Sequence, residues 1–526
     1  MTYYITTPIF YVNDLPHIGS AYPTIACDFF AGHMRQRGID TAFLTGTDEH
    51  GQKIEKAAAS QNKNPQEHCD YISEEFKKLW EILDIDYQFF VRTSSAEHKK
   101  FVADFFTKVQ ASGDIYVGDY KGLYCVSCED FWLEKDLGEG NTCPTHKTKV
   151  EEYSQKNYFF KLSKYEERLK QYINDNPEFI CPEYRRNEVL GWFKEGLKDF
   201  PISRVGLEWG IPVPGDNEGQ KIYVWFDALL SYISGLGAQK DKYWKNGADG
   251  KVIHVIGKDI LRFHAIYWPA MLMSAEYPLP AKVFGHGFLT KDGMKMGKTL
   301  GNVIDPIALS EKFGAEAVKF YFLREIMFGR DGDYTDESFI LRLNSDLANN
   351  LGNLLNRALK LVNKNFGGKV PSFGLDPALE AEFKQSHEII LGAIDNLDSF
   401  LALETVFKML DKVNADINVK EPWKLLKNAE PGSAEFKTAG ISLATAAEAC
   451  KRAAFYLAPL MPNLSTKIFS NLGLLKDSAQ KRSTVLSTVF NLSKIDDSLE
   501  GIEVNPNTEA IFQRLELEAN KATASI

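Results

Sequence analysis

The strongest constraint on the fold is the pattern of apolar residues, which shifts along the chain from alternating strands and helices to helices alone. Over residues 1–115, strand-like segments such as "YYITTPIFYV" and "DTAFLTGTDEH" alternate with helical segments, one of them at 21–37. In another helical segment, 96–113, apolar residues recur every four positions and form an amphipathic face. Because strands that alternate with helices pair in parallel, this part of the chain predicts one half of a parallel sheet.

The alternation stops over residues 116–200, where the elements look short and irregular. Over residues 201–285 strand patterns return in "KIYVWFDALL", "KVIHVIGKDI" and "AKVFGHGFLT". A long helical segment, "KDILRFHAIYWPAMLMSAEY", lies between the last two. We therefore expect an insertion over 116–200 and a second half of the sheet over 201–285.

Strand patterns fade after residue 338. Four segments have apolar residues at helical spacing: "DESFILRLNSDLANNLGNLLNRALKLVNKN", "ALEAEFKQSHEIILGAIDNLD", "ETVFKMLDKVNADINV" and "TAGISLATAAEACKRAAFYLAPLM". The stretch "NFGGKVPSFGLDP" (365–377) predicts a loop between the first two. The expected fold class is thus α/β, with a split parallel-sheet domain, a connecting region over 286–337 and an all-α helical bundle over 338–526.

Composition and charge exclude several classes of protein. With 526 residues, 44% of them apolar and 25% charged, the chain resembles a globular protein of several domains. No apolar run approaches the ~18 residues of a membrane helix, so we expect no membrane partner. The net charge of −10 argues against coating of nucleic acid by bulk electrostatics, but it leaves room for an RNA held by a local basic patch.

The N-terminus and the cysteines indicate a compartment. The first residues, "MTYYITTPIF", have neither the basic and apolar pattern of a signal peptide nor the Arg-rich pattern of a transit peptide. Seven cysteines in a chain of this length form no disulfide scaffold, and an odd number suits a reducing environment. We therefore expect a cytoplasmic protein.

A cysteine and histidine pattern inside the insertion predicts a metal site. Cys125 and Cys128 form one pair of ligands three residues apart, and Cys143 and His146 form a second pair. This spacing is typical of a tetrahedral Cys3His zinc site, and a site with four protein ligands is structural rather than catalytic. We expect one zinc ion that stabilises an insertion too irregular to fold alone.

Two short stretches far apart in the sequence suggest a nucleotide site. "FYVNDLPHIGSAY" (10–22) reads as a strand, a turn and the start of a helix, where a nucleotide phosphate can dock, although it has no glycine-rich phosphate loop. "DGMKMGKTLGN" (292–302) places Lys295 and Lys298 in a loop that contains glycines. For two lysines at this spacing alone, an exposed basic turn is the ordinary interpretation.

Taken together, "HIGS" and "KMGKT" resemble the HIGH and KMSKS signatures of class I aminoacyl-tRNA synthetases, at the corresponding places in the fold. The resemblance implies that His17 contacts ATP phosphates and that Gly19 leaves a flat surface for the adenine, because a side chain there would collide with the base. It also implies that Lys295 and Lys298 stabilise the pentavalent phosphorus and the leaving pyrophosphate.

Both signatures depart from the family pattern. Ser20 replaces the second histidine of HIGH, so we do not carry an imidazole's role over to it. Gly297 and Thr299 replace the two serines of KMSKS, while both lysines are kept. The predicted catalytic residues are His17, Ser20, Lys295 and Lys298, and the predicted ATP site adds Gly19 and Thr299.

Longer stretches resemble the methionyl-tRNA synthetase family over nearly the whole chain, among them "TTPIFYVNDLPHIGSAY", "FLTGTDEHGQKI", "YVWFDALLSYI", "GKDILRFHAIYWPAML" and "NVKEPW". The resemblance implies a Rossmann-like catalytic domain with a methionine pocket and an anticodon-binding helical bundle. Asp48 matches the carboxylate that holds the α-ammonium group, and Arg204 and Asp259 match a polar pair near the aromatic wall. The other matching pocket residues are Ile9, Tyr11, Trp225, Ala228, Leu229, Tyr232, Ile260 and His264.

The residue types of this pocket suit methionine. The methionine side chain is flexible and polarizable, and its sulfur makes favourable contacts with aromatic rings. For Trp225 or Tyr232 taken alone, packing in the core is the ordinary explanation, and Asp48 and His50 could simply cap a strand. Their place at the carboxyl end of a sheet strand is where ligands bind in open α/β folds.

In the helical domain, Asn353, Arg357 and Trp423 match the anticodon-reading residues of the family. A tryptophan can stack on an unpaired base while asparagine and arginine bond to base edges. For Asn353 and Arg357, four residues apart on one helix face, packing between helices stays the alternative. Pro422, just before Trp423, is also a residue expected at a helix boundary.

The sequence therefore predicts a methionine–tRNA ligase. It would form methionyl-adenylate from L-methionine and ATP, with Mg²⁺ accompanying the ATP, and transfer methionine to tRNA(Met), including initiator tRNA. We expect a monomer, because no further β-rich module follows the helical domain.

Two other classes stay open. One is a nucleotidyltransferase with a HIGH-type turn that makes a small cofactor, although such enzymes need neither the zinc insertion nor the helical domain. The other is a non-catalytic, zinc-bearing RNA-binding protein, which would not need Asp48, His17 and the paired lysines together. A relative specific for valine, isoleucine or leucine would carry a large editing insertion, and residues 116–200 are too few for one.

Overall fold

The structure is a computed structural model that describes residues 1–516 except 127–129, 133, 135–136, 146, 246–249, 297–300, 476–481 and 509. The chain divides into two compact units. Unit 1 comprises Met1–Pro16, Thr41–Glu81 and Tyr87–His286, and unit 2 comprises His17–Asp40, Ile82–Asp86 and Gly287–Ile526.

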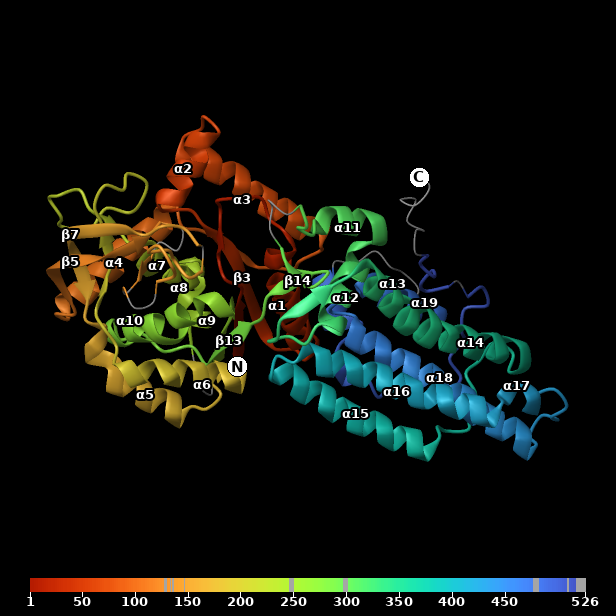
Figure 1. The fold of residues 1–526 in the computed structure, drawn as a ribbon. Coiled ribbons are helices and arrows are strands. Elements are labelled where there is room, and N and C mark those ends of the chain that lie inside the picture. Colours follow the sequence, from red (N-terminus) through yellow and green to blue (C-terminus); the bar gives the residue numbers. More distant parts are fainter. Residues whose placement is uncertain are drawn as a thin grey trace, which may run out of the picture. The chain divides into compact units, whose positions relative to one another are not determined.

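A parallel sheet forms the centre of unit 1 (Figure 1). Its seven strands, counted in the described part of the chain, run in the order β2–β3–β1–β12–β13–β8, with β4 also paired to β3. Strand β12 pairs in parallel with both β1 and β13, so that Ile253 lies opposite Ile5 on one side and Lys282 on the other. The strands are β1 (Thr2–Thr6), β2 (Phe10–Tyr11), β3 (Asp40–Asp48), β4 (Phe89–Arg92), β8 (Ile180–Cys181), β12 (Gly250–Gly257) and β13 (Lys282–His286).

The predicted α/β class with a parallel sheet is confirmed. Strands from before residue 116 and from after residue 201 lie in the same sheet, as expected. In β3 and β12 nearly every residue is buried, which is typical of parallel strands covered on both faces. Apolar residues of the sheet share one core with helices α4 (Ala96–Ala111) and α10 (Trp268–Ser274), and Phe10 of β2 stacks on Phe76 of α3 (Pro65–Ile82).

One predicted strand is wrong. The segment "KIYVWFDALL" forms only a short strand, β11 (Lys221–Ile222), and then a helix, α7 (Val224–Leu229). Its aromatic and β-branched residues favour a strand, but an apolar run this short has no decisive period. Burial of Phe226 against Phe105 and Phe106 of α4 stabilises the helix instead.

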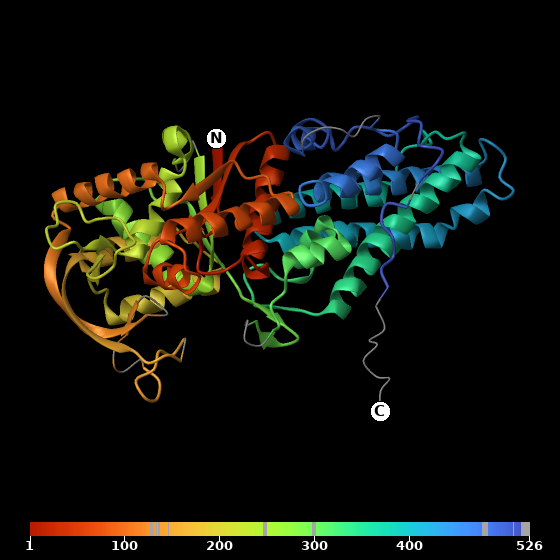
Figure 2. The same cartoon turned by 90° about the horizontal axis from the view of Figure 1, so that it is seen from above.

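The segment expected to be short and irregular contains two long strands, so that expectation is wrong in part. Strands β5 (Ile115–Cys125) and β7 (Glu151–Phe160) pair antiparallel along their whole length and curve together at the edge of unit 1 (Figure 2). Strands β6 (Asp130–Trp132) and β9 (Phe200–Pro201) extend this sheet on its two sides. The same segment also returns to the parallel sheet through β8.

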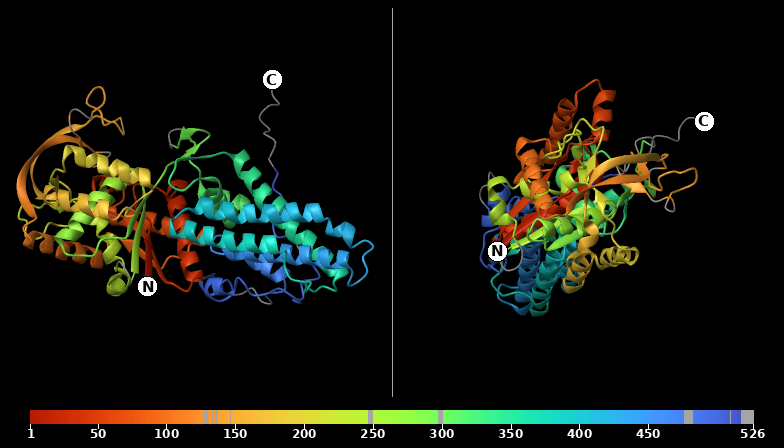
Figure 3. Two further views of the ribbon diagram at one scale, coloured as in Figure 1. Left: turned by 90° about the horizontal axis from the view of Figure 1, so that it is seen from below. Right: turned by 90° about the vertical axis from the view of Figure 1, so that its left-hand side faces the viewer.

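Unit 2 consists mostly of helices, in agreement with the helical pattern after residue 338. Helix α16 packs between α15 and α18, and the three run side by side (Figure 1) and again from below (Figure 3). The predicted loop at 365–377 is confirmed, since α14 ends at Asn365 and α15 begins at Pro377. The main helices are α12 (Ala315–Glu325), α13 (Asp336–Leu343), α14 (Asn353–Asn365), α15 (Pro377–Asp395), α16 (Ser399–Lys420), α17 (Pro422–Leu425), α18 (Ala434–Leu457) and α19 (Pro462–Asn471).

Helix α1 (Ile18–Gln36) belongs to unit 2 rather than to the unit that holds the sheet. It packs against α12 and α20 (Arg482–Thr488), and its Asp28 carboxylate accepts a hydrogen bond of 2.7 Å from the Arg482 guanidinium. A small three-stranded sheet, β14 (Leu289–Lys291), β15 (Met294–Lys295) and β16 (Gly332–Tyr334), also lies in unit 2.

Candidate active site

The turn at the start of α1 is built around His17. The Nδ1 atom of its ring accepts a hydrogen bond of 3.0 Å from the Gly19 amide and so caps the helix. The Ser20 hydroxyl donates to the His17 carbonyl at 2.7 Å and accepts from the His17 amide at 3.2 Å. A Cβ atom at Gly19 would lie 2.7 Å from Cε1 of His17, so glycine is what lets the ring fold back over the turn.

The predicted lysine loop is described only in part. Lys295 ends β15, which pairs antiparallel with β14, and its exposed side chain follows exposed Met294. The Lys295 carbonyl accepts a hydrogen bond of 3.2 Å from the Asn302 side chain. Gly297, Lys298 and Thr299 lie outside the described residues.

Several predicted pocket residues meet around His264. The Tyr232 hydroxyl lies 2.7 Å from Nε2 of His264, and Nδ1 of the same ring lies 3.0 Å from the Ile260 carbonyl. A carbonyl can only accept, so Nδ1 carries the proton and Nε2 accepts from the tyrosine. Burial lowers the pKa of His264 to about 4, so the ring is neutral near pH 7.

An aromatic wall stands beside this pair. The Trp225 ring stacks on Phe263 with centroids 3.8 Å apart and lies edge-on to His264 at 6.5 Å. Ala228 and Leu229 follow in the same helix, α7, and both are buried. Ile9 is partly buried and packs against the apolar core that includes Leu229 and Phe263.

The remaining predicted methionine-site residues lie at the carboxyl ends of strands. Asp48 is the last residue of β3, is 8% exposed, and stands opposite Tyr11 of β2 in the sheet register. Asp259 is exposed in the turn that follows β12. The carboxyl edge of a parallel sheet is the usual ligand-binding edge.

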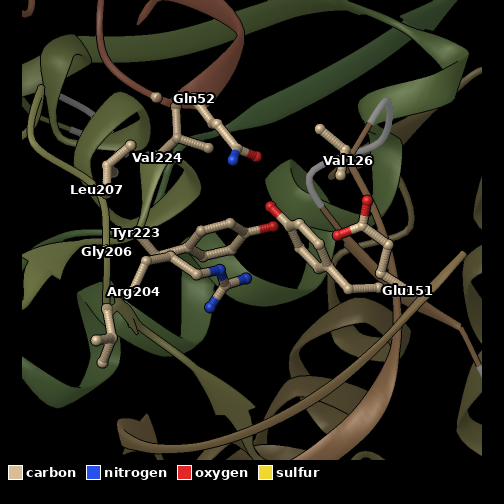
Figure 4. A pocket seen from close by; sticks show the side chains of 11 residues that line it. Gln52, Val126, Glu151, Arg204, Gly206, Leu207, Tyr223 and Val224 are labelled. Atoms are coloured by element: carbon tan, nitrogen blue, oxygen red, sulfur yellow. The ribbon is translucent and has the colours of Figure 1, made fainter.

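Arg204 borders a cavity of about 70 Å³ within unit 1 (Figure 4). Its guanidinium lies 4.0 Å from the ring centroid of Tyr223, whose side chain projects into the cavity beside that of Gln52. Glu151 of β7 lies on another wall. The cavity therefore adjoins both the loop after Asp48 and the start of α7.

The loop after Asp48 is held by residues that sequence reasoning missed. Glu49 is fully buried, and its carboxylate accepts two hydrogen bonds from Arg92, at 2.7 and 3.0 Å. The hydroxyls of Thr47 and Ser94 donate to the same carboxylate. The acidic pair in "TDEH" is the only local signal for this anchor, because Arg92 lies 43 residues further along the chain.

The predicted zinc ligands are only partly described. Cys125 and Cys143 are both fully buried and form a small apolar cluster with Val150. Cys125 Sγ lies 3.5 Å from the Thr148 hydroxyl, and the Cys143 amide donates to the Thr148 carbonyl at 2.8 Å. Cys128 and His146 lie outside the described residues, and among the described residues no three potential ligands are grouped around one point.

Two of the predicted anticodon readers are in contact. The Arg357 guanidinium lies 4.7 Å from the ring centroid of Trp423 and donates a hydrogen bond of 3.2 Å to the Asn418 side chain. Asn353 is exposed at the first position of α14, one turn before Arg357. Glu421, with a φ of 45°, ends α16 in a left-handed conformation, and Pro422 begins α17 as predicted.

Comparison with known proteins gives the class first. Residues 3–156 and 141–359 match the family model described as tRNA synthetases class I (M), so the chain is a member of that class. It is 48% identical over 491 residues to a protein named methionine–tRNA ligase from Nostoc sp., covering 90% of each chain. It is 44% identical over 536 residues to another of that name from Synechocystis sp., covering 99% of each chain.

A solved structure agrees with these relatives. The structure of Mycobacterium tuberculosis methionyl-tRNA synthetase in complex with methionyl-adenylate superposes with a TM-score of 0.89, at 38% identity, over 98% of this chain and 100% of that one. The chain belongs to the methionine–tRNA ligase family. In the described part of the chain, no helix is both long and apolar enough to cross a bilayer.

Proposed function

We propose that this chain joins methionine to tRNA at the expense of ATP. The observation that carries the proposal is the pocket of Trp225, Tyr232 and neutral His264, assembled in a chain whose relatives are named methionine–tRNA ligase. Asp48 at the end of β3 supplies the charge that an α-ammonium group needs. The similar solved structure holds methionyl-adenylate, the product of the first step.

The reaction has two displacement steps. The methionine carboxylate attacks the α-phosphorus of ATP, and pyrophosphate leaves with the bonding electron pair. A ribose hydroxyl at the 3′ end of the tRNA then attacks the methionyl carbonyl, loses its proton, and AMP leaves. No protein side chain needs to form a covalent bond to the substrate, so catalysis rests on positioning and on stabilising negative charge.

The pocket residues suit the thioether of methionine. Aromatic rings such as Trp225 make favourable contacts with sulfur. Because the Tyr232 hydroxyl donates a hydrogen bond to the neutral His264 ring, the pair presents a fixed, uncharged polar surface rather than a mobile cation. Arg204 and Asp259, with the other matching residues at Ile9, Tyr11, Ala228, Leu229 and Ile260, complete the proposed methionine site.

The proposed ATP site combines the α1 turn with the lysine loop. His17, Gly19 and Ser20 form the turn, with the Ser20 hydroxyl acting through the helix cap, so this serine supports the turn rather than replacing a second histidine. Lys295, Lys298 and Thr299 supply positive charge and a hydroxyl from the loop. Mg²⁺ would be held mainly by the ATP phosphates, as this ion usually is.

We also propose a structural zinc ion in the insertion. The two described candidates, Cys125 at the end of β5 and Cys143, are buried in one small cluster, which fits a ligand set with Cys128 and His146. Thiolate and imidazole ligands at this spacing suit zinc. The ion would connect the ends of two long strands.

The partner is proposed to be tRNA(Met), including the initiator form, read by Asn353, Arg357 and Trp423. Functionally, residues 1–115 and 201–285 would form the catalytic domain, 116–200 the zinc-bearing insertion, 286–337 the connecting region and 338–526 the anticodon-binding domain.

A cytoplasmic location and a monomeric state stay predictions.

ATP–pyrophosphate exchange tests the proposal. Labelled pyrophosphate should enter ATP when methionine is present, and not with leucine, isoleucine or valine. Exchange that requires no amino acid would favour a nucleotidyltransferase that acts on a different substrate. If folded, zinc-replete protein gives no exchange with any of these amino acids, the synthetase function is wrong.

A further inference from the structure

Asp227 of α7 is a buried carboxylate that the proposed mechanism does not use. Its Oδ2 lies 2.6 Å from Nδ1 of His50, and its Oδ1 lies 2.6 Å from Nε2 of His98. The second ring nitrogen of His98 lies 2.6 Å from the Ser234 hydroxyl. Asp227, His50 and His98 are each at most 2% exposed. We call these four residues the Asp227 network.

The carboxylate of this network is charged. Burial alone would raise the pKa of Asp227, but His50 and His98 hold it at about 2. An ionised carboxylate only accepts hydrogen bonds, so each ring presents an N–H to it. Such charge-assisted hydrogen bonds are roughly twice as strong as neutral ones, and they fix both rings in direction as well as in distance.

Helix geometry separates Asp227 from the pocket that it supports. At about 100° per residue, Asp227 lies about 160° around α7 from Trp225, whereas Ala228 and Leu229 lie within about 60° of Trp225. The pocket residues thus share one face of the helix, and Asp227 marks the opposite face. Helix α4, which carries His98, also packs its phenylalanines against Phe226.

The network joins the segments that carry the proposed methionine site. His50 lies in a loop, two residues after Asp48, and Asp48 is the residue that would bind the ammonium group of methionine. Ser234 ends α8 (Ser231–Ser234), the helix that carries Tyr232. Asp227 itself lies between Trp225 and Ala228 in the sequence. One carboxylate therefore connects the ammonium-binding end of the site to its aromatic wall.

We propose that Asp227 is a positioning residue that sets the affinity for methionine by fixing Asp48 and the Trp225 face of α7 relative to each other. This inference rests on the proposed function. Such a residue contacts no substrate itself but holds two parts of the methionine site in place. Its loss should therefore weaken the binding of methionine and leave the binding of ATP, which is held elsewhere, unchanged.

The test is pyrophosphate exchange with Asp227→Asn, which keeps the size of the side chain and removes its charge. The KM for methionine should rise about tenfold or more, while the KM for ATP should change by less than about twofold. His98→Gln, which keeps a donor for the carboxylate, should show a smaller rise of the same kind. In the double variant Asp227→Asn/His98→Gln, the rise in the KM for methionine should be smaller than the product of the two single rises, because both substitutions break the same network.

Asp114→Asn is the matched control. Asp114 is a carboxylate of the same unit, 1% exposed, that accepts hydrogen bonds from Lys164, Tyr165 and Ser274. Its loss should lower the melting temperature without changing the KM for methionine. If Asp227→Asn behaves like this control, the network is only structural and the inference is wrong.

Two further results keep the test decisive. If circular dichroism shows that Asp227→Asn does not fold, His98→Gln takes its place, and an unchanged KM for methionine in that variant overturns the inference. Failure of the proposed function would be visible separately, since the unsubstituted protein would then show no methionine-dependent exchange.

Discussion

At the scale of single residues, His17 and Gly19 share one space at the start of α1. The ring of His17 lies where a Cβ atom of residue 19 would be, and it accepts a hydrogen bond from the Gly19 amide. The flat surface expected for adenine is therefore covered by the ring. An adenine that stacks on Gly19 would have to displace the His17 ring. Binding of the adenine would therefore move the side chain that is expected to contact the ATP phosphates.

Gly19→Ala should weaken ATP use because the added methyl group occupies the surface expected for the adenine. It also displaces the His17 ring and removes a cap hydrogen bond of about 1 kcal/mol. We expect the KM for ATP in pyrophosphate exchange to rise about tenfold, with the KM for methionine unchanged. Gly392→Ala in α15, where a Cβ meets no atom within 4 Å, is the control and should leave both constants unchanged.

His264 should contribute to the acid sensitivity of the fold. Its pKa is near 6.5 when the chain is unfolded and about 4 when it is buried, so the unfolded state binds the proton more tightly. The neutral ring makes its full contribution to the free energy of unfolding above pH 6.5. As the pH falls from 6.5 to 4, this free energy decreases by about 3 kcal/mol.

Unfolding free energy measured against pH in urea checks this expectation. His264→Gln should have a shallower slope between pH 6.5 and 4 than the unsubstituted protein. Part of the slope should remain, because burial also lowers the pKa of His33, to about 3. Identical slopes for the two proteins would show that His264 does not titrate in this way.

Sequence reasoning reached the pocket but not its supports. Trp225, Tyr232 and His264 were named from a resemblance, and the structure brings their rings together. Glu49 with Arg92 and Asp227 with His98 were missed. The partners of each pair lie 43 and 129 residues apart, and no local pattern records a side-chain contact over such a distance.

At the scale of elements, strongly periodic segments were predicted correctly and short apolar runs were not. The long helices α15, α16 and α18 follow the expected pattern, and so does β3. Residues 221–230 mislead because a run of that length fits either a strand or a buried helix, and tertiary packing decides. The long β5–β7 pair was missed because its residues include many charged and glycine positions with weak alternation.

The junction of α14 with α16 and α17 should control tRNA charging without affecting activation. Trp423→Ala removes a ring that can stack on a base, a contact worth about 1–3 kcal/mol, so charging efficiency should fall about 10- to 100-fold. Pyrophosphate exchange should not change. Trp423→Phe should lose less, because a ring remains for both the base and Arg357.

Lys424→Ala, an exposed change in the same short helix, is the control for this experiment. Equal loss of charging in Lys424→Ala and Trp423→Ala would indicate a general charge effect. Loss of exchange in Trp423→Ala would place this residue in folding rather than in tRNA recognition.

The insertion should bind about one zinc ion per chain. Protein purified without chelator and analysed by metal emission spectroscopy should contain zinc, and Cys125→Ser should remove it, because loss of one of four ligands weakens a structural site severely. Cys181→Ser, a change at a half-buried cysteine outside the pattern, is the control. Zinc that persists in Cys125→Ser would contradict the ligand set.

At the scale of the whole molecule, the proposed functions are divided between the two units. Unit 1 holds every proposed methionine-site residue, while unit 2 holds His17, Lys295 and the anticodon readers. The sequence order does not show this division, because α1 follows the first strands directly but clusters with the helices beyond residue 287. Substitutions of the proposed site residues in unit 1 should therefore act on methionine kinetics, and substitutions of the proposed site residues in unit 2 on ATP or tRNA.

The net charge of −10 argues against binding of tRNA by the overall field and favours local contacts. The proposed anticodon readers Asn353, Arg357 and Trp423 would supply such contacts. Recognition of the anticodon can be measured without reference to any variant of the protein.

The most direct measurement is attachment of labelled methionine to tRNA transcripts. A transcript with the methionine anticodon CAU should be charged to near completion with methionine and ATP. The same transcript with a changed anticodon should be charged far more slowly. Absence of methionyl-tRNA from the CAU transcript, with protein that is folded and contains zinc, would contradict the proposed ligase activity.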